Sequence, residues 1–269
     1  MKRTNEFIFT LMIGLGLAVP AYADKIVVEG STTVLPIAQR CAEEFMNTNK
    51  DADISVRGGG SGVGITSFIE GTCDIADSSR PIKDEELEKA VSRGRDPKAN
   101  VVAMDGIAVI VNNDNGVDGL TKAQLKAIYT GKVSDWSQVG GSQGQIVVVS
   151  RDSASGTFEA FGEMALDKAK VRSDALMEAS NQAVASVVAK TPGAVGYVGL
   201  AYLSGVKVVK LDGVAASKET VLSKQYKLSR PLFMYTNGKP GGLTKEFIDF
   251  IFSAKGQKLV DEEGFVSIK

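Results

Sequence analysis

Short β-branched segments alternate with helical segments along this chain, and that alternation limits the folds that it can adopt. Residues 26–28, 54–56 and 73–76 are short apolar runs that predict strands. Between them, apolar residues recur at helical spacing over 34–45 and 65–69. Strands that alternate with helices in this way pair in parallel, with the helices covering the faces of the sheet. The sequence therefore predicts an α/β fold that is built on a parallel sheet.

A second series of the same kind begins at Gly106. Strands are predicted over 106–111 and 146–150, and helices over 123–129 and from Phe158. The later elements that we predict are a helix over 184–189, strands over 194–198 and 232–235, a helix over 244–252 and another from Lys255.

The two series indicate two α/β lobes. We predict that lobe 1 holds residues 24–105 and 231–269 and that lobe 2 holds residues 106–230. The joining segments are then strands near 106–111 and 231–236 rather than a flexible tether, because the chain has no long polar linker.

The N-terminal segment has the order of charges and apolar residues that is typical of a secretory signal peptide. Lys2 and Arg3 precede an apolar run over 7–19, and Ala21 and Ala23 provide the small residues of a cleavage site. The alternative is an uncleaved membrane anchor, but the run is shorter than the roughly 20 residues that a span needs. We predict a signal peptide over residues 1–23 and a periplasmic location.

The composition argues against several classes of function. The chain has no histidine and two cysteines, which excludes a Ser-His-Asp triad and disfavours a zinc or iron site. Its 31 basic and 32 acidic residues form no basic stripe of the kind that nucleic-acid-binding proteins carry. We therefore predict no metal, no cofactor and no nucleic-acid partner. Cys41 and Cys73 have two open alternatives, a disulfide in an oxidising compartment or two buried thiols.

Glycine and hydroxyl residues follow four of the predicted strands, at the point where each strand ends. In open α/β sheets, ligands bind at the carboxyl ends of strands. A helix that starts there also presents unpaired N–H groups and the positive end of its dipole. A single turn of this kind is most often a plain turn or a helix cap, so only the presence of four of them at strand ends indicates a binding site. Together they predict a cage of donors for a small oxyanion, formed by Gly30-Ser31-Thr32-Thr33, Gly58 to Gly64, Asp77 to Arg80 and Arg151 to Thr157.

Nucleotide-binding motifs do not match the glycine-rich turn. A P-loop requires Lys-Ser/Thr after its last glycine, whereas Gly64 is followed by Ile65. The third glycine of a dinucleotide fingerprint is also missing, since that position again holds Ile65. Serine-lysine chemistry stays formally open, although no S-x-x-K motif lies at these turns.

The four turns, with Ile128 to Trp136 and Pro192 to Val198, resemble the periplasmic phosphate-binding proteins of phosphate ABC importers along the whole of residues 24–269. The resemblance implies a type II periplasmic binding protein fold, in which two lobes joined by two crossing strands close on the anion. It implies inorganic phosphate and transmembrane permease subunits as partners, and a monomer that is not an enzyme. The phosphate-binding positions that it implies are Thr32, Thr33, Ser61, Arg151, Ser155, Gly156 and Thr157, with Ser31 adjacent.

The third turn departs from the pattern of this family. Many members have an aspartate there that accepts the proton of hydrogen phosphate and rejects sulfate, and the matching residue here is Ser79. A serine can still accept a hydrogen bond, and we include Ser79 among the site residues. Asp77 and Asp152 are further candidate acceptors. The alternative for Asp77 is a solvated carboxylate at the end of a strand, and the alternative for Arg80 is a surface cation. Two alternative functions remain. The protein could bind sulfate or molybdate instead of phosphate, or it could be a secreted phosphatase with a serine or threonine nucleophile.

Overall fold

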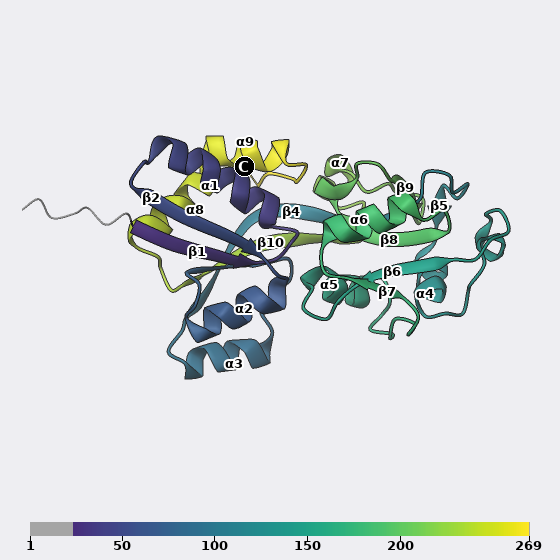
Figure 1. The fold of residues 1–269 in the computed structure, drawn as a ribbon, viewed down its shortest axis with the longest axis horizontal. Helices are drawn as coiled ribbons and strands as arrows, with labels where there is room; N and C mark the ends of the chain where they lie inside the picture. Colours follow the sequence, from purple (N-terminus) through teal and green to yellow (C-terminus); the bar gives the residue numbers. More distant parts are fainter. Residues whose placement is uncertain (1–23, 269) are drawn as a thin grey trace, which may run out of the picture.

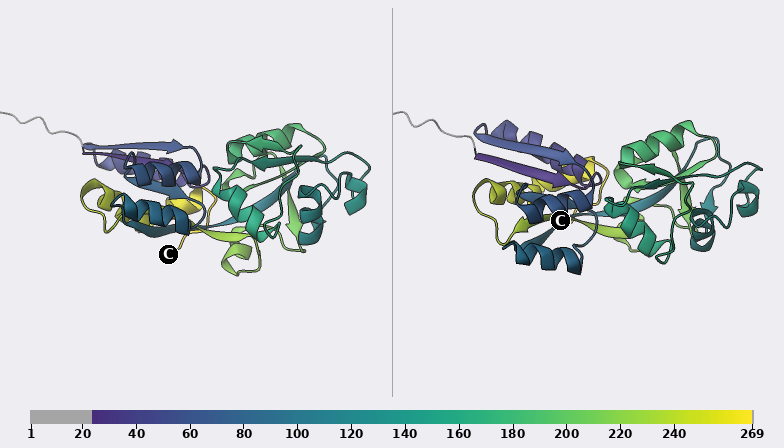
Figure 2. Two further views of the ribbon diagram at one scale, coloured as in Figure 1. Left: turned by 90° about the horizontal axis from the view of Figure 1, so that it is seen from below. Right: turned by 60° about the horizontal axis from the view of Figure 1, so that its bottom comes forward.

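The computed structural model describes residues 24–268, so the predicted signal peptide lies outside the described residues. Figure 1 shows two bodies side by side, connected by the strands β4 (Pro97–Val111) and β10 (Ser229–Asn237). The two views in Figure 2 show the same division. Within the described part of the chain, no helix combines the length and the apolar character that a membrane crossing requires.

Lobe 1 is a sheet covered by helices on both faces. Its remaining strands are β1 (Asp24–Gly30), β2 (Ala52–Gly58) and β3 (Ile75–Ser78), and its helices are α1 (Leu35–Thr48), α2 (Ser61–Glu70), α3 (Asp84–Ser92), α8 (Gly242–Phe252) and α9 (Ala254–Glu262). In Figure 1, α1, α8 and α9 lie over one face, and α2 and α3 lie over the other. The larger core of this lobe includes Phe45, which packs edge-on against Phe247 at 5.9 Å and Phe250 at 5.5 Å between ring centres.

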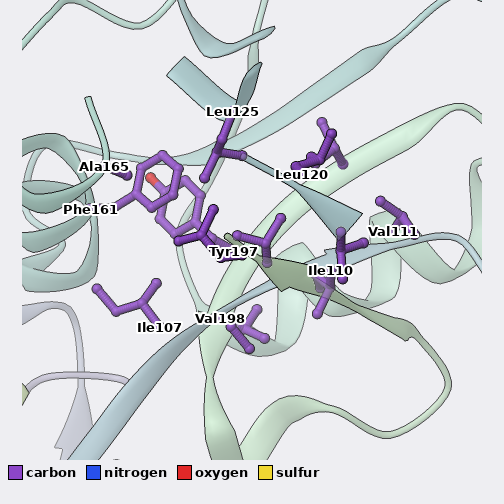
Figure 3. Close-up of a cluster of buried hydrophobic side chains, with 14 of the residues drawn as sticks. Ile107, Ile110, Val111, Leu120, Leu125, Phe161, Ala165, Tyr197 and Val198 are labelled. Carbon is purple, nitrogen blue, oxygen red and sulfur yellow. The ribbon is translucent and has the colours of Figure 1, made fainter. Parts of the chain in front are cut away.

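Lobe 2 is built around strands that run into the same continuous sheet. Its strands are β5 (Gly119–Leu120), β6 (Val147–Arg151), β7 (Leu176–Glu178), β8 (Ala194–Gly199) and β9 (Lys207–Leu211), and its helices are α4 (Lys122–Tyr129), η1 (Trp136–Val139), α5 (Gly156–Met164), α6 (Asn181–Lys190), η2 (Leu200–Tyr202) and α7 (Lys218–Leu222). Figure 3 shows part of the core, in which Phe161 stacks on Tyr197 with the ring centres 3.9 Å apart.

The strand pairing is parallel on the outer side of each lobe and antiparallel wherever β4 or β10 takes part. β1 pairs in parallel with β2 and β3, and β6 pairs in parallel with β7 and β8. β10 is antiparallel to β3 and β4, and β4 is antiparallel to β8. The predicted parallel pairing therefore holds for the outer strands of each lobe, and the centre is antiparallel because β4 and β10 cross from one lobe to the other in opposite directions.

The chain passes between the two cores at two places. β4 pairs with β10 up to Gly106 and with β8 from Ile107. On the return crossing, Leu228 belongs to the core of lobe 2 and Leu232 to that of lobe 1. Residues 231–236 are paired with β3 and β4 inside lobe 1, so the second crossing begins before the predicted segment.

The third strand is displaced from its predicted position. It runs over Ile75–Ser78 instead of 73–76, because its pairing with β1 places Gly30 opposite Asp77. Gly30 has a φ of +144°, and a Cβ there would come within 2.2 Å of the Asp77 carbonyl oxygen, so only glycine fits this crossing. Asp77 and Ser78 thus belong to a buried strand, and the turn proper begins at Ser79.

Both cysteines are buried free thiols. Cys41 lies on α1 and Cys73 precedes β3. Burial is the main cause that raises the pKa of each thiol to about 12, so both stay protonated and unreactive at neutral pH. Of the two alternatives that the sequence left open, the structure has the buried thiols.

Candidate functional site

Residues from the four turns meet between the two lobes. Thr33 of lobe 1 and Thr157 of lobe 2 have their hydroxyl oxygens 3.0 Å apart. The Gly62 N–H donates to the carbonyl of Ala154 across the same boundary at 2.9 Å. All nine residues that we predicted for the site are buried here: Ser31, Thr32, Thr33, Ser61, Ser79, Arg151, Ser155, Gly156 and Thr157.

In the first turn, a serine binds backbone N–H groups and two threonine hydroxyls remain available. The helix α1 begins after this turn, at Leu35. The hydroxyl oxygen of Ser31 accepts from the Thr33 N–H at 3.1 Å and from the Val34 N–H at 3.4 Å. Because Ser31 satisfies these N–H groups, the hydroxyls of Thr32 and Thr33 can face the other lobe.

The second and fourth turns approach each other more closely than most side chains allow. A Cβ on Gly156 would lie 2.4 Å from the Ser61 hydroxyl oxygen and 2.8 Å from that of Ser79. Ser61 opens α2 and accepts from the Ser79 N–H at 3.0 Å, while the two serine oxygens lie 3.3 Å apart. Ser155 caps α5 by accepting from the Phe158 N–H at 3.2 Å. Gly156 is therefore required for the lobes to meet at this point.

Arg151 is a buried cation, and no carboxylate of residues 24–268 forms a salt bridge with it. Its Nε donates to the Glu178 carbonyl at 3.0 Å, and one terminal nitrogen donates to the Ala179 carbonyl at 2.9 Å and to the Thr32 hydroxyl at 3.2 Å. Its other terminal nitrogen, Nη1, is buried and has no partner among the described residues. Burial is the largest cause that lowers the pKa of Arg151 from its usual value. An unpaired buried cation of this kind is costly unless an anion binds next to it.

Two residues that the sequence analysis missed link the hydroxyl groups. Asn181, the first residue of α6, donates through Nδ2 to the Thr32 hydroxyl at 3.2 Å and to the Thr33 hydroxyl at 3.0 Å. Arg230, at the start of β10, donates to the Thr157 hydroxyl at 2.9 Å and to that of Thr33 at 3.4 Å. An arginine that opens an apolar strand is a weak signal in the sequence, and Asn181 gives none beyond its place at a helix start.

Arg230 is held by a buried aspartate on the other crossing strand. Its Nη2 lies 2.9 Å and its Nε 3.2 Å from Asp105 Oδ2, and both side chains are almost fully buried. Burial raises the pKa of Asp105, and the Arg230 guanidinium opposes that change. A charged residue inside the apolar run over 101–111 needs a buried partner, so Asp105 was the signal that could have pointed to Arg230.

The acidic candidates of the sequence analysis do not enter the network of hydroxyls. Both carboxylate oxygens of Asp77 are buried without a hydrogen-bond partner among the described residues, and burial raises the pKa of Asp77 well above its usual value. The Asp77 carboxylate also contributes to the raised pKa of Cys41. The solvated carboxylate that we considered for Asp77 is therefore wrong. Asp152 accepts from the Ala154 N–H at 2.9 Å and shapes its own turn.

Arg80 joins the lobes at the edge of the site. It makes two 2.7 Å hydrogen bonds to Glu86 in lobe 1, and its Nε lies 2.9 Å from a carboxylate oxygen of Glu159 in lobe 2. Lys83 contacts the same carboxylate at 3.0 Å. Arg80 is buried, so the alternative of a surface cation is wrong. A groove of about 350 Å³ between the lobes is lined by Arg80, Lys83 and Glu159 together with Ser79 and Arg230.

Comparisons with known proteins agree on the family. A model of the PBP superfamily domain matches residues 18–255. The chain is 38% identical over 250 residues to the phosphate-binding protein PstS of Bacillus subtilis (strain 168), with 91% of this chain and 81% of the relative covered. It is 37% identical over 254 residues to the PstS protein of Staphylococcus aureus (strain USA300), with 89% and 77% covered.

Solved structures show the same fold. The phosphate-bound crystal structure of a substrate-binding protein assigned to a phosphate ABC transporter of Clostridium perfringens has a TM-score of 0.85 and 35% identity, and 91% of this chain and all of that chain are covered. An ABC-type phosphate transport receptor from Vibrio cholerae has a TM-score of 0.74 and 31% identity, with 90% and 99% covered. The predicted two-lobed α/β architecture is thereby confirmed as the type II periplasmic binding protein fold. The chain belongs to the PstS family of phosphate-binding proteins within the PBP superfamily.

Proposed function

We propose that this protein captures inorganic phosphate between its two lobes and delivers it to the permease subunits of an ABC importer. The observation that carries the proposal is Arg151, a buried cation with an unpartnered nitrogen and no bound carboxylate. An anion at this place would receive a charge-assisted hydrogen bond from Nη1. Preorganised hydroxyl and N–H donors around it would disperse the remaining charge. The phosphate-binding relatives support phosphate as that anion.

The predicted site residues are proposed to act as one set of ligands. Thr32 and Thr33 would bind from lobe 1, and Arg151 and Thr157 from lobe 2. The serine pair Ser61 and Ser79 forms the adjoining wall, while Ser31, Ser155 and Gly156 shape the turns that hold these groups.

The geometry favours binding over hydrolysis. A serine or threonine nucleophile needs an adjacent base that removes its proton. The Thr32 and Thr33 hydroxyls instead receive hydrogen bonds from Asn181, and Thr157 receives one from Arg230. Amide N–H and guanidinium groups cannot accept the hydroxyl proton, so these contacts provide no general base for a nucleophile. We therefore propose a transport protein that is not an enzyme.

Closure of the lobes would trap the anion. We propose that the chain bends at Gly106–Ile107 and at 228–230, where strand pairing passes from one core to the other. The contacts between the threonines would then form only in the closed arrangement. We further propose that residues 1–23 direct export to the periplasm and that the protein acts there as a monomer.

A titration of the purified protein with phosphate, sulfate and molybdate tests the proposed function. We expect one phosphate to bind per chain and to be displaced poorly by the other two anions. Binding of sulfate or molybdate in preference to phosphate would reassign the ligand. Turnover of a chromogenic phosphate ester would favour the phosphatase instead.

The contact of Glu159 with Arg80 and Lys83 makes a prediction for the closed state. Glu159→Gln removes one charge of a partly buried interlobe cluster, and we expect phosphate to bind about threefold to tenfold more weakly, mainly through faster dissociation. Stopped-flow release of phosphate measures the rate. Glu163→Gln is the matched control, because Glu163 lies one turn along α5 and pairs with Lys168 of its own lobe at 3.5 Å. Equal release rates in the two variants would refute a role for Glu159 in closure.

A further inference from the structure

The side-chain amide of Asn181 is held in one orientation. The Gly199 N–H donates to its Oδ1 at 3.2 Å, which leaves Nδ2 to face the threonines. Asn181 has no exposed surface, so water cannot substitute for these partners. Because a backbone N–H can only donate, the amide must present its two N–H groups, and not its oxygen, to Thr32 and Thr33.

The direction of the hydrogen bonds limits what each threonine hydroxyl can do. A hydroxyl has two lone pairs and one proton. The Thr32 oxygen accepts from Arg151 and Asn181, so both of its lone pairs are occupied. The Thr33 oxygen accepts from Asn181 at 3.0 Å, whereas Arg230 Nη2 lies 3.4 Å away and already donates its two protons to Asp105 and Thr157.

The protons of these hydroxyls must therefore point away from their donors. Thr33 lies 3.0 Å from Thr157, which also accepts from Arg230. If Thr33 donates to Thr157, both lone pairs of Thr157 are occupied and the Thr157 proton is released toward the site. If Thr157 donates instead, the Thr33 oxygen accepts from Asn181 and Thr157, and the Thr33 proton is released toward the site. In either case, Thr32 and one hydroxyl of the Thr33–Thr157 pair each present a proton to the site.

We propose that Asn181 is a positioning residue that fixes Thr32 and one hydroxyl of the Thr33–Thr157 pair as donors, so that this wall favours deprotonated oxygens of the anion. The inference rests on the proposed function. The proton of hydrogen phosphate then binds at the adjoining wall, where the paired hydroxyls of Ser61 and Ser79 can still accept a hydrogen bond. Selection for the more ionised form of phosphate would follow from the orientation of neutral groups, without a carboxylate in the site.

The charged and titratable groups around Asn181 come from five elements. Arg151 lies on β6, Arg230 on β10 and Asp105 on β4, and the Tyr202 hydroxyl of η2 donates to the Thr32 carbonyl at 2.6 Å. Tyr197 on β8 contacts the backbone N–H of Arg151 at 3.2 Å. All five are common to the wild type and to variants at position 181, so their own titration cancels in a comparison between the two.

The test is the pH profile of phosphate affinity in Asn181→Ala, measured by calorimetry at pH 5.5 and pH 8. The wild type is expected to bind phosphate more tightly at pH 8, where the doubly charged form prevails. Loss of the amide lets the hydroxyls rotate and accept, so affinity should fall about tenfold at pH 8 and no more than about twofold at pH 5.5. An equal loss at both pH values would show that Asn181 only supports the structure and would overturn the proposal.

Two further variants complete the experiment. Asn181→Asp keeps the shape of the side chain but reverses its polarity, because its carboxylate would accept the threonine protons. Its loss of affinity at pH 8 should exceed that of Asn181→Ala, and an affinity at pH 8 equal to that of the wild type would overturn the proposal. Asn112→Ala removes another buried amide, which binds the carbonyls of Val188 and Ala189 at the far end of α6, and should leave the pH profile unchanged.

The proposed function and this inference fail in different ways. A wild type that binds no phosphate refutes both. A wild type that binds phosphate equally at pH 5.5 and pH 8, with variants that change affinity by the same factor at both, refutes only the role of Asn181.

Discussion

Arg151→Ala is expected to abolish tight binding of phosphate while the protein remains folded. Arg151 is buried, and its Nη1 has no partner among the described residues. Arg230 is already paired with Asp105, so we propose that the guanidinium of Arg151 supplies the charge that binds phosphate. Removing one partner of a buried, hydrogen-bonded charge pair costs about 2–5 kcal/mol, which corresponds to a loss of about 30-fold to several thousand-fold in affinity. Isothermal calorimetry with phosphate measures this loss.

Arg93→Ala is the matched control for that experiment. Arg93 is an exposed arginine of lobe 1 that contacts Glu70 at 3.2 Å, far from the turns of the site in the sequence. Its removal should leave phosphate affinity unchanged, and circular dichroism should show that both variants are folded. An unchanged affinity in Arg151→Ala would refute the proposed site.

Asp77→Asn is expected to make the protein more stable at pH 8. Asp77 is fully buried in lobe 1 with no hydrogen-bond partner among the described residues, and burial raises its pKa well above the usual value. A carboxyl group with a raised pKa in the folded state keeps its proton longer there than in the unfolded chain. Its contribution to stability is therefore complete at pH values below about 4, the unfolded pKa, and is lost as the pH rises toward the folded pKa.

Asparagine has a similar shape but cannot ionise, so the variant lacks this loss. We expect its free energy of unfolding to exceed that of the wild type by about 1–3 kcal/mol at pH 8 and to lie close to it at pH 4. Urea unfolding in phosphate-free buffer at the two pH values measures the difference. Asp53→Asn, an exposed aspartate of β2 that contacts Lys25 at 3.3 Å, should change stability by no more than about 0.5 kcal/mol. The same dependence on pH in the wild type and in Asp77→Asn would contradict the prediction.

Most of the early elements could be predicted because their signals are local. The strands β1 and β2 contain the predicted apolar runs, and α1 and α2 follow the helical spacing that was read from 34–45 and 65–69. The helix α3 and the first half of β4 were not predicted. The burial of β4 depends on β10, which lies more than one hundred residues further along the chain, so no local pattern could establish it.

The polar residues inside strands show the same limit. Asp77 looked like part of a turn because a carboxylate is seldom buried without a partner. Its place in β3 is set by the pairing of Gly30 with Asp77 and of Met234 with Asp77. Both contacts join segments that are distant in the sequence, which is why the strand was displaced by two residues in the prediction.

The amino-acid sequence by itself determined the alternation of strands and helices and the four turns rich in glycine and hydroxyl groups, because these depend on the spacing of nearby residues. Only the tertiary structure decided that Asn181 and Arg230 orient the threonine hydroxyls. The physical reason is that a hydrogen bond has a direction. The direction in which each hydroxyl donates is set by partners from the other lobe and the crossing strands, which folding brings within about 3 Å.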